Sequence, residues 1–453
     1  MNKEKMLSST LYDLAKKIVK CVEESKRKKE IIITKQLSVK AKISDFKYEK
    51  ESSGFKTSFE NTFKEEWHWK NEFDFIEKRI KQLDEYKESN QNISKIFKTS
   101  INQSDTWLSK FVHKVANEAM HGIDDRRIID LITLFICDLE RNPILWKPII
   151  WLDGIYMETD IIEITGRCKI KKPEPIDLEY EISYKTFPMF DQMASHYIPS
   201  AIMTIEHRAK GLSEMLKKIE KIVTILRLFK VGSVSTVRIK WNPISILQPD
   251  GTICKTIPSS ATFKYELNKE DEKKLQTFFE IIEPKIPTAV IEKGKGETNF
   301  ITIAFDRYND SLLKQDIPES KLASAIMCLE ALYLKDEERS ELSERLSQRT
   351  AVAINFFNYN SLEVFNILKK SYNIRSRFVH GSKIEKEERK GLMKLVEKVI
   401  DYARISIVMF LLIGESIEKD KFLSMLNNSL LDDKAKQKLK ELIEKKCQWL
   451  IKS

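Results

Sequence analysis

An arginine, a histidine and a glycine stand close together near the end of a strongly helical segment: Arg375, His380 and Gly381. Imidazole exchanges protons near neutral pH, and the forked guanidinium group can hold two phosphate oxygens at once. A proton acceptor beside such a cation can remove a proton and stabilise the negative charge that develops in a reaction. Because so short a spacing also recurs by chance, the surrounding elements must support it.

Two backbone geometries can bring a guanidinium to the imidazole. On a regular helix Arg375 and His380 lie about 140° apart around the axis, whereas Arg377 and His380 share a face. Arg377 can then be the working cation. Alternatively, the helix ends before His380, Gly381 adopts a left-handed cap, and the unwound turn brings Arg375 to His380.

Three charged residues upstream are candidates to orient this pair: Glu330, Arg345 and Arg349. Each also has an ordinary structural interpretation. Glu330 stands among apolar residues. A glutamate in such a sequence commonly lies at a solvated helix edge or is paired to an arginine. Arg345 and Arg349 are four residues apart with Glu341 and Glu344 nearby, which is equally typical of a surface lattice of salt bridges.

The elements that must position these residues are helices. Apolar residues recur at helical spacing over five segments of the last third of the chain, residues 322–334, 340–357, 361–379, 385–413 and 419–446. Short breaks that contain Asn or Gly separate several of these segments. The pattern predicts an all-α bundle over residues 316–453.

The rest of the chain divides into two further regions. The first, residues 1–145, is predicted to be mostly helical, with a loop or partly ordered linker over residues 38–66. The second, residues 146–312, is predicted to be an α+β domain with helices over 212–229 and 269–282. Strands are expected in that domain within 149–164, 166–170, 198–207, 234–241, 260–267 and 298–306. The whole chain is therefore predicted to be a mixed fold.

Composition narrows the function classes. Hydrophobic residues make up 42% and charged residues 32% of the 453 residues, which excludes a disordered chain. With only 12 Gly, the sequence is poor in the glycine loops that cradle nucleotide phosphates, and neither a Walker loop nor a dinucleotide fingerprint is found. The net charge of +10 favours a polyanionic partner, although lysine-rich solvated helix faces account for it equally simply.

The cysteines and the apolar runs bear on location. None of the six cysteines forms a CxxC pair, which is typical of free thiols in a reducing cytoplasm and not of a zinc site or a disulfide framework. No export signal is recognised, and no apolar run approaches the ~20 residues of a membrane span. We expect a cytoplasmic protein with no metal, no cofactor and no membrane partner.

The C-terminal segments carry a family resemblance. Residues 316–453 resemble an Apea-like HEPN domain through five successive motifs: Leu329-Glu330-Ala331-Leu332, Glu344 to Ala351, Tyr372, Arg375-Ser376 and Val379-His380-Gly381. Residues 151–155 and 170–174 are similar to the sensor-like regions that often precede such domains. The resemblance implies a short helical bundle with metal-independent endoribonuclease activity, a site completed by two protomers, and a role in antiphage or toxin-like defence.

The motif of that family transfers to Arg375 and His380, with Ser376 in the polar position after the arginine. RNA would be the partner, and a homodimer the active form. The ribose 2′-OH is then the nucleophile, the products are a 2′,3′-cyclic phosphate and a 5′-hydroxyl, and DNA is inert. Two alternatives stay open: a noncatalytic HEPN bundle that binds RNA or dimerises, and a structural interaction protein that recruits a separate effector.

Overall fold

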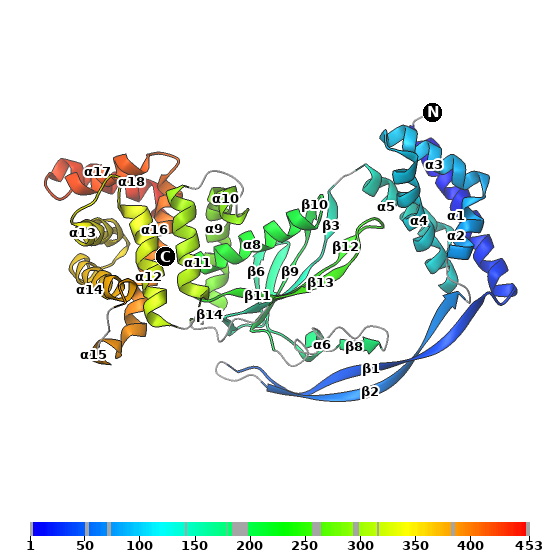
Figure 1. The fold of residues 1–453 in the computed structure, drawn as a ribbon, viewed down its shortest axis with the longest axis horizontal. Coiled ribbons are helices and arrows are strands. Elements are labelled where there is room, and N and C mark those ends of the chain that lie inside the picture. Colours follow the sequence, from blue (N-terminus) through cyan, green and yellow to red (C-terminus); the bar gives the residue numbers. More distant parts are fainter. Residues whose placement is uncertain are drawn as a thin grey trace.

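The computed structural model describes residues 3–49, 54–69, 74–140, 143–178, 180–183, 198–255, 263, 265–292, 299–314, 317–381 and 386–449. Figure 1 shows an elongated molecule with a group of helices at each end and a β-sheet between them. The predicted mixture of helical ends and a central α+β part is therefore confirmed at this coarse level.

The N-terminal helices form a core of their own at one end of the molecule (Figure 1). They are α1 (Lys3–Arg27), α2 (Asp74–Lys81), α3 (Asp84–Phe97), α4 (Ile101–His121) and α5 (Asp125–Leu139). Leu11, Phe111 and Phe135 are fully buried there because their apolar neighbours recur every three to four residues along each helix.

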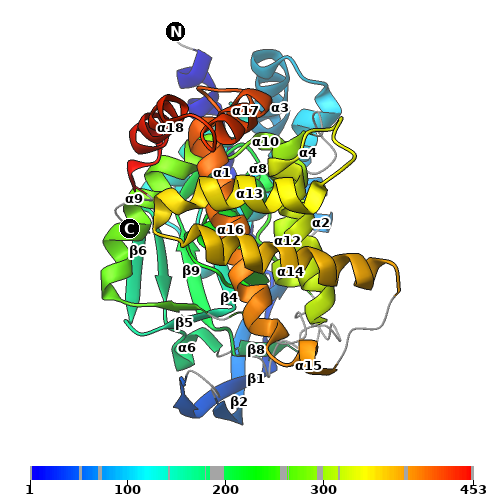
Figure 2. The same ribbon diagram turned by 90° about the vertical axis from the view of Figure 1, so that its left-hand side faces the viewer.

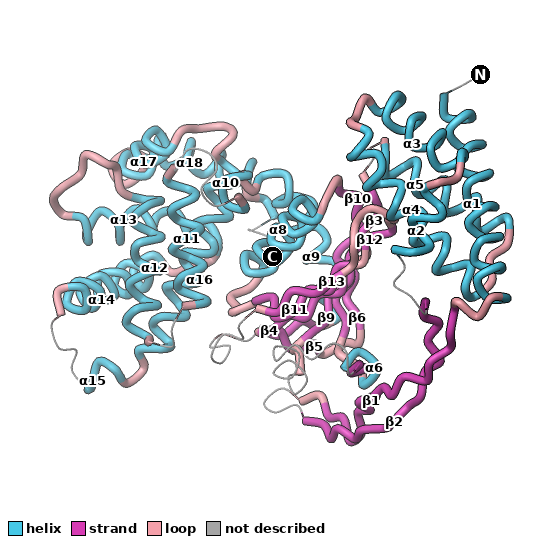
Figure 3. Tube along the Cα trace, turned by 45° about the vertical axis from the view of Figure 1, so that its right-hand side comes forward, coloured by secondary structure: helices cyan, strands magenta, loops and turns pink. Residues whose placement is uncertain are grey.

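A long antiparallel hairpin leaves this helical group and extends beneath the central sheet (Figures 1 and 3). Its strands are β1 (Ile31–Lys47) and β2 (Gly54–Trp69), and the short β8 (Tyr180–Ser183) pairs with the other edge of β1. The expectation of a loop or linker over residues 38–66 is wrong. Apolar residues alternate in Leu37, Val39, Ala41 and Ile43, a two-residue period concealed by the charges between them.

The central part is built on a six-stranded sheet in the order β13-β11-β4-β9-β7-β6, in which neighbouring strands are antiparallel. The strands are β4 (Ile149–Asp153), β6 (Ile161–Thr165), β7 (Cys168–Lys171), β9 (Ala201–Ile205), β11 (Ser235–Trp241) and β13 (Gly251–Cys254). Smaller pairings join β3 (Ile144–Trp146) to β10 (His207–Ala209) and β12 (Pro243–Ile244), and β5 (Ile155–Met157) to β14 (Tyr265–Leu267). The strands expected within 149–170, 198–207 and 234–241 are thus confirmed.

The helices of the central part are α6 (Pro175–Leu178), α8 (Leu212–Phe229), α9 (Lys269–Ile282), the 3₁₀ turn η1 (Glu283–Lys285) and α10 (Thr288–Ile291). The two predicted helices over 212–229 and 269–282 are confirmed. The expected strand over 298–306 is wrong, because α11 (Phe300–Leu313) begins there. The Asn299 side chain accepts hydrogen bonds from the first backbone N–H groups of α11 and Thr302 bonds back, a capping box that fixes a helix start.

The C-terminal bundle contains α12 (Pro318–Tyr333), α13 (Leu342–Ile354), η2 (Asn355–Phe357), α14 (Ser361–Val379), α15 (Lys386–Arg389), α16 (Leu392–Ile413), α17 (Lys419–Asn428) and α18 (Asp433–Lys446). Figure 2 shows α13 and α14 lying across α12 and α16. The second half of α16 is buried on every side, so this helix is the centre of the bundle. The five predicted helical segments are present, and two of them are each divided into two helices.

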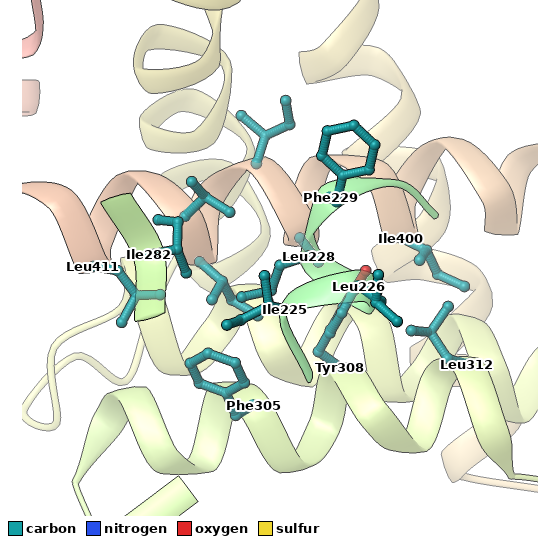
Figure 4. Close-up of a cluster of buried hydrophobic side chains, with 14 of the residues drawn as sticks. Ile225, Leu226, Leu228, Phe229, Ile282, Phe305, Tyr308, Leu312, Ile400 and Leu411 are labelled. Carbon is teal, nitrogen blue, oxygen red and sulfur yellow. The ribbon is translucent and has the colours of Figure 1, made fainter. Parts of the chain in front are cut away.

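One hydrophobic core joins the central part to the C-terminal bundle. The last turns of α8, from Ile222 to Phe229, are buried all round. Figure 4 shows side chains of α8 meeting Ile282 of α9, Phe305 of α11 and Leu411 of α16 in a single cluster. The hydrophobic core therefore continues without a break from residues 146–312 into the helices that follow.

Candidate functional site

Helix α14 carries the residues that the sequence singled out. Asn360 caps its start by accepting a hydrogen bond from the backbone N–H of Glu363, and Val364, Leu368, Ser371 and Ile374 are buried along one face. That face packs against α12, α13 and α16. The opposite face is consequently turned to solvent.

The solvent face of α14 is polar and basic. Asn366, Lys370 and Asn373 are exposed, Arg377 is half-buried, and His380 is exposed at the end of the helix. These residues follow one another at intervals of three or four, so they form a single stripe along the helix surface. Arg377 and His380 were predicted as site residues, whereas Asn366, Lys370 and Asn373 were not, although their helical spacing places them on the same face.

The end of α14 has the predicted glycine cap. Gly381 has a φ of +71° and its N–H bonds to the Phe378 carbonyl, while the N–H of His380 bonds to the Ser376 carbonyl at 3.1 Å. The helical path therefore continues to His380 without an unwound turn. On such a path Arg377, three residues earlier, points to the same side as His380, and Arg375 does not.

Arg375 is directed into the bundle instead. Its Nη2 lies 3.1 Å from a carboxylate oxygen of Glu330 on α12, and its guanidinium carbon lies 5.7 Å from the centre of the Tyr372 ring. Burial raises the pKa of the Glu330 carboxyl, and the nearby Arg375 and Tyr372 oppose that rise. This ion pair ties α14 to α12.

Breaking this ion pair is expected to destabilise the bundle modestly. With side chains 22% and 19% exposed, Arg375→Ala leaves the Glu330 carboxylate with little solvation and should lower the free energy of unfolding by roughly 1–3 kcal/mol, measured by urea titration. Because a carboxyl whose pKa is raised in the folded state destabilises it once ionised, the loss should be larger near pH 7 than at about pH 4.

Two comparisons make this prediction specific. Arg375→Ala combined with Glu330→Gln should recover most of the stability, because no buried charge remains. Lys370→Ala, at an exposed position of the same helix, should change little. A double variant as unstable as Arg375→Ala would show that lost packing, and not the orphaned carboxylate, causes the effect.

Arg377 also has a carboxylate partner. Its Nη2 lies 2.6 Å from Glu388 of α15, so the two ends of the segment that follows α14 are linked by charge. Ser376 is half-buried, and its carbonyl accepts the bond that fixes the His380 backbone. Within the part of the chain that the structure describes, the imidazole of His380 makes no hydrogen bond or ion pair.

Arg345 and Arg349 both pair with a carboxylate other than Glu330. Glu338, between α12 and α13, is 3.0 Å from Arg345 and 2.7 Å from Arg349. Arg349 also donates to the Tyr333 carbonyl and to the Asn427 side chain. These contacts lock three segments of the bundle together, and none of them reaches Arg375 or His380. Arg345 and Arg349 therefore do not contact Arg375 or His380, the pair that they were predicted to orient.

Glu338 itself was missed by the sequence analysis. The guanidinium groups of Arg349 and Arg345, together with the backbone N–H of Lys335, lower the pKa of its carboxyl to about 2. No local signal marks this residue, since Glu337 and Glu338 are adjacent and only the fold decides which one meets the arginines.

Among the described residues, no group of three or more His, Cys, Asp or Glu side chains is placed to hold a metal ion. Among the described helices, none combines the length and the apolar composition that crossing a lipid bilayer requires.

Comparison with known proteins gives no relative for this chain: no protein-family model, no curated protein and no solved structure matches it.

Proposed function

We propose that the C-terminal bundle is a HEPN-type endoribonuclease that cleaves RNA without a metal ion. The observation that carries the proposal is the exposed imidazole of His380 at the end of the basic stripe on α14. Lys370 and the arginine of this stripe suit the phosphates of a nucleic acid backbone, and no protein group competes for the imidazole among the described residues.

The roles follow from the positions of the side chains. His380 accepts the proton of the ribose 2′-OH, and the 2′ oxygen then attacks the adjacent phosphorus. The bond from phosphorus to the 5′ oxygen breaks, and the 5′ oxygen takes a proton from solvent and leaves as a hydroxyl. Arg377, on the same side of α14, stabilises the negative charge of the phosphorane, for which it must exchange Glu388 for the substrate phosphate. Arg375 positions α14 through Glu330. The family resemblance implies Arg375 as the cation, and in this proposal Arg377 takes that role.

A second protomer fits the same proposal. Phe378 and Val379 are exposed beside His380, and apolar side chains next to a polar site are typical of a surface that another protein covers. A symmetric pair of α14 helices would place two copies of the stripe along one RNA strand. The homodimer, the cytoplasmic location and a role in defence remain parts of this proposal.

Incubation with labelled RNA in EDTA tests the activity. We expect cleavage that leaves 2′,3′-cyclic phosphate and 5′-hydroxyl ends, because the nucleophile comes from the substrate and no metal is required. The matched control is the same oligonucleotide with 2′-deoxyribose at every position, which should remain intact. Cleavage of both oligonucleotides, or cleavage that EDTA abolishes, would contradict the proposed chemistry.

The noncatalytic alternative has its own signature. A bundle that only binds RNA would retain the oligonucleotide without cutting it, and the retention would weaken steeply with salt because Lys and Arg contacts release counterions.

A further inference from the structure

A cavity of about 290 Å³ lies where the central part meets the C-terminal bundle. Residues at the end of α8, at the start of α9, around η2, on α16 and after α18 line it. Figure 4 shows the Phe229 ring at the end of α8, set apart from the other labelled side chains. None of the residues of the His380 stripe lines the cavity.

One wall of the cavity is cationic. Arg404 is held rigidly, because its guanidinium donates to the carbonyls of Leu228 and Phe229 and pairs with Asp401 at 2.7 Å. Lys230 lies 2.7 Å from Asp271. These two cations are therefore balanced by two carboxylates.

Lys274 is the third cation at this wall. It is exposed on α9 and, within the described residues, makes no hydrogen bond or ion pair. The cavity consequently carries a net positive charge, and an anion that enters it gains a partner without breaking an existing pair.

The other walls are aromatic. Trp449 packs against Phe278 with ring centres 4.7 Å apart, and Phe229 lies 5.7 Å from the same ring. Phe357 and Tyr359 also line the cavity. Flat aromatic surfaces beside a cationic wall suit a ligand with a planar ring at one end and a negative charge at the other.

Size limits the choice of ligand further. About 290 Å³ is just below the range for small-molecule sites, which run from roughly 300 to 1,000 Å³. A single base, sugar and phosphate is of this order, whereas a dinucleotide is larger. We propose that this cavity binds a nucleoside monophosphate, with the base against the aromatic walls and the phosphate at Lys274.

Isothermal titration of the full chain with AMP, GMP, CMP and UMP tests the inference. We expect at least one of them to bind, and the matching nucleoside and inorganic phosphate to bind at least about tenfold more weakly, since each offers only half of the contacts. The absence of heat with all four nucleotides at millimolar concentration would overturn the assignment. Phosphate binding as tightly as the nucleotide would overturn it as well.

Two variants locate the site. Lys274→Glu should weaken nucleotide binding at least about tenfold, because it places a negative charge beside the phosphate. Lys273→Glu is the matched control, since Lys273 is an exposed neighbour on α9 that does not line the cavity, and it should bind like the parent. Equal binding by the Lys274→Glu protein would overturn the proposal.

His380→Ala separates this site from the proposed nuclease site. We expect the variant to bind the nucleotide as the parent does, whether or not the parent cleaves RNA. Nucleotide binding that is lost with His380→Ala and kept with Lys274→Glu would assign the ligand to α14 instead of the cavity.

Discussion

Replacing His380 with alanine is expected to slow RNA cleavage by about 10²- to 10⁴-fold, the usual contribution of a general base. The rate of cleavage of a labelled oligonucleotide in EDTA measures the change. Stability should not fall, because the imidazole is exposed and makes no hydrogen bond or ion pair among the described residues. A lower rate can then be attributed to chemistry and not to unfolding.

The matched control is His121→Ala, which removes another exposed imidazole at the end of a helix, here α4 in the N-terminal group. That variant should cleave like the parent. If His380→Ala cleaves as fast as the parent, His380 is not the base and the proposed nuclease site is wrong. If it binds RNA as the parent does and no longer cleaves, binding and chemistry are separate functions of α14.

The second large effect is a loss of stability that we expect when the ion pair of Arg349 and Glu338 is broken. Their side chains are 2% and 9% exposed, and Arg349→Met leaves a nearly buried carboxylate with only Arg345 beside it. Removing one partner of a buried pair typically costs about 3–5 kcal/mol, so the free energy of unfolding should fall by about that amount. Urea titration followed by circular dichroism measures the loss.

Arg339→Met serves as the control, because Arg339 is an exposed neighbour whose guanidinium bonds only to backbone carbonyls within the described residues. It should change the stability little. The combination of Arg349→Met with Glu338→Gln should be more stable than Arg349→Met alone, since it removes the orphaned charge. A loss below about 1 kcal/mol for Arg349→Met would show that this cluster does not hold the bundle together.

Acid titration gives the same cluster a pH signature. The pKa of Glu338 is lowered from its ordinary value of 4.5 to about 2 in the folded protein. The stabilisation from this carboxylate is therefore complete above about pH 4.5 and is lost as the pH falls toward 2. In the Glu338→Gln variant, the part of the stability loss at low pH that is due to this carboxylate should be absent.

The sequence predicted helices best where one face is apolar. In α9 and α14 the buried residues recur at three and four, so tertiary packing only reinforces the local pattern. The hairpin of β1 and β2 was missed for the opposite reason. Its alternating residues are diluted by Lys, Ser and Glu, and the pairing that stabilises it joins Ile31 to Trp69 across the chain.

The sequence predicted which residues form the candidate site, but not how their side chains are arranged. Arg375, Arg377 and His380 were found from their spacing, but which arginine shares the side of His380 depends on whether the helix continues to that residue. The backbone bond from His380 to the Ser376 carbonyl decides the question. Arg349 could not be placed at all, because its partner Glu338 lies eleven residues earlier, beyond the reach of helical spacing.

The buried end of α8 also limits how this chain can be rearranged in evolution. Phe305, Leu411 and Ile225 belong to three separate stretches of sequence and share one apolar cluster. A recombination event that moved residues 316–453 onto another protein would strip the bundle of side chains that α8 and α11 supply. We therefore expect the C-terminal helices to be stable only in a chain that keeps the central part.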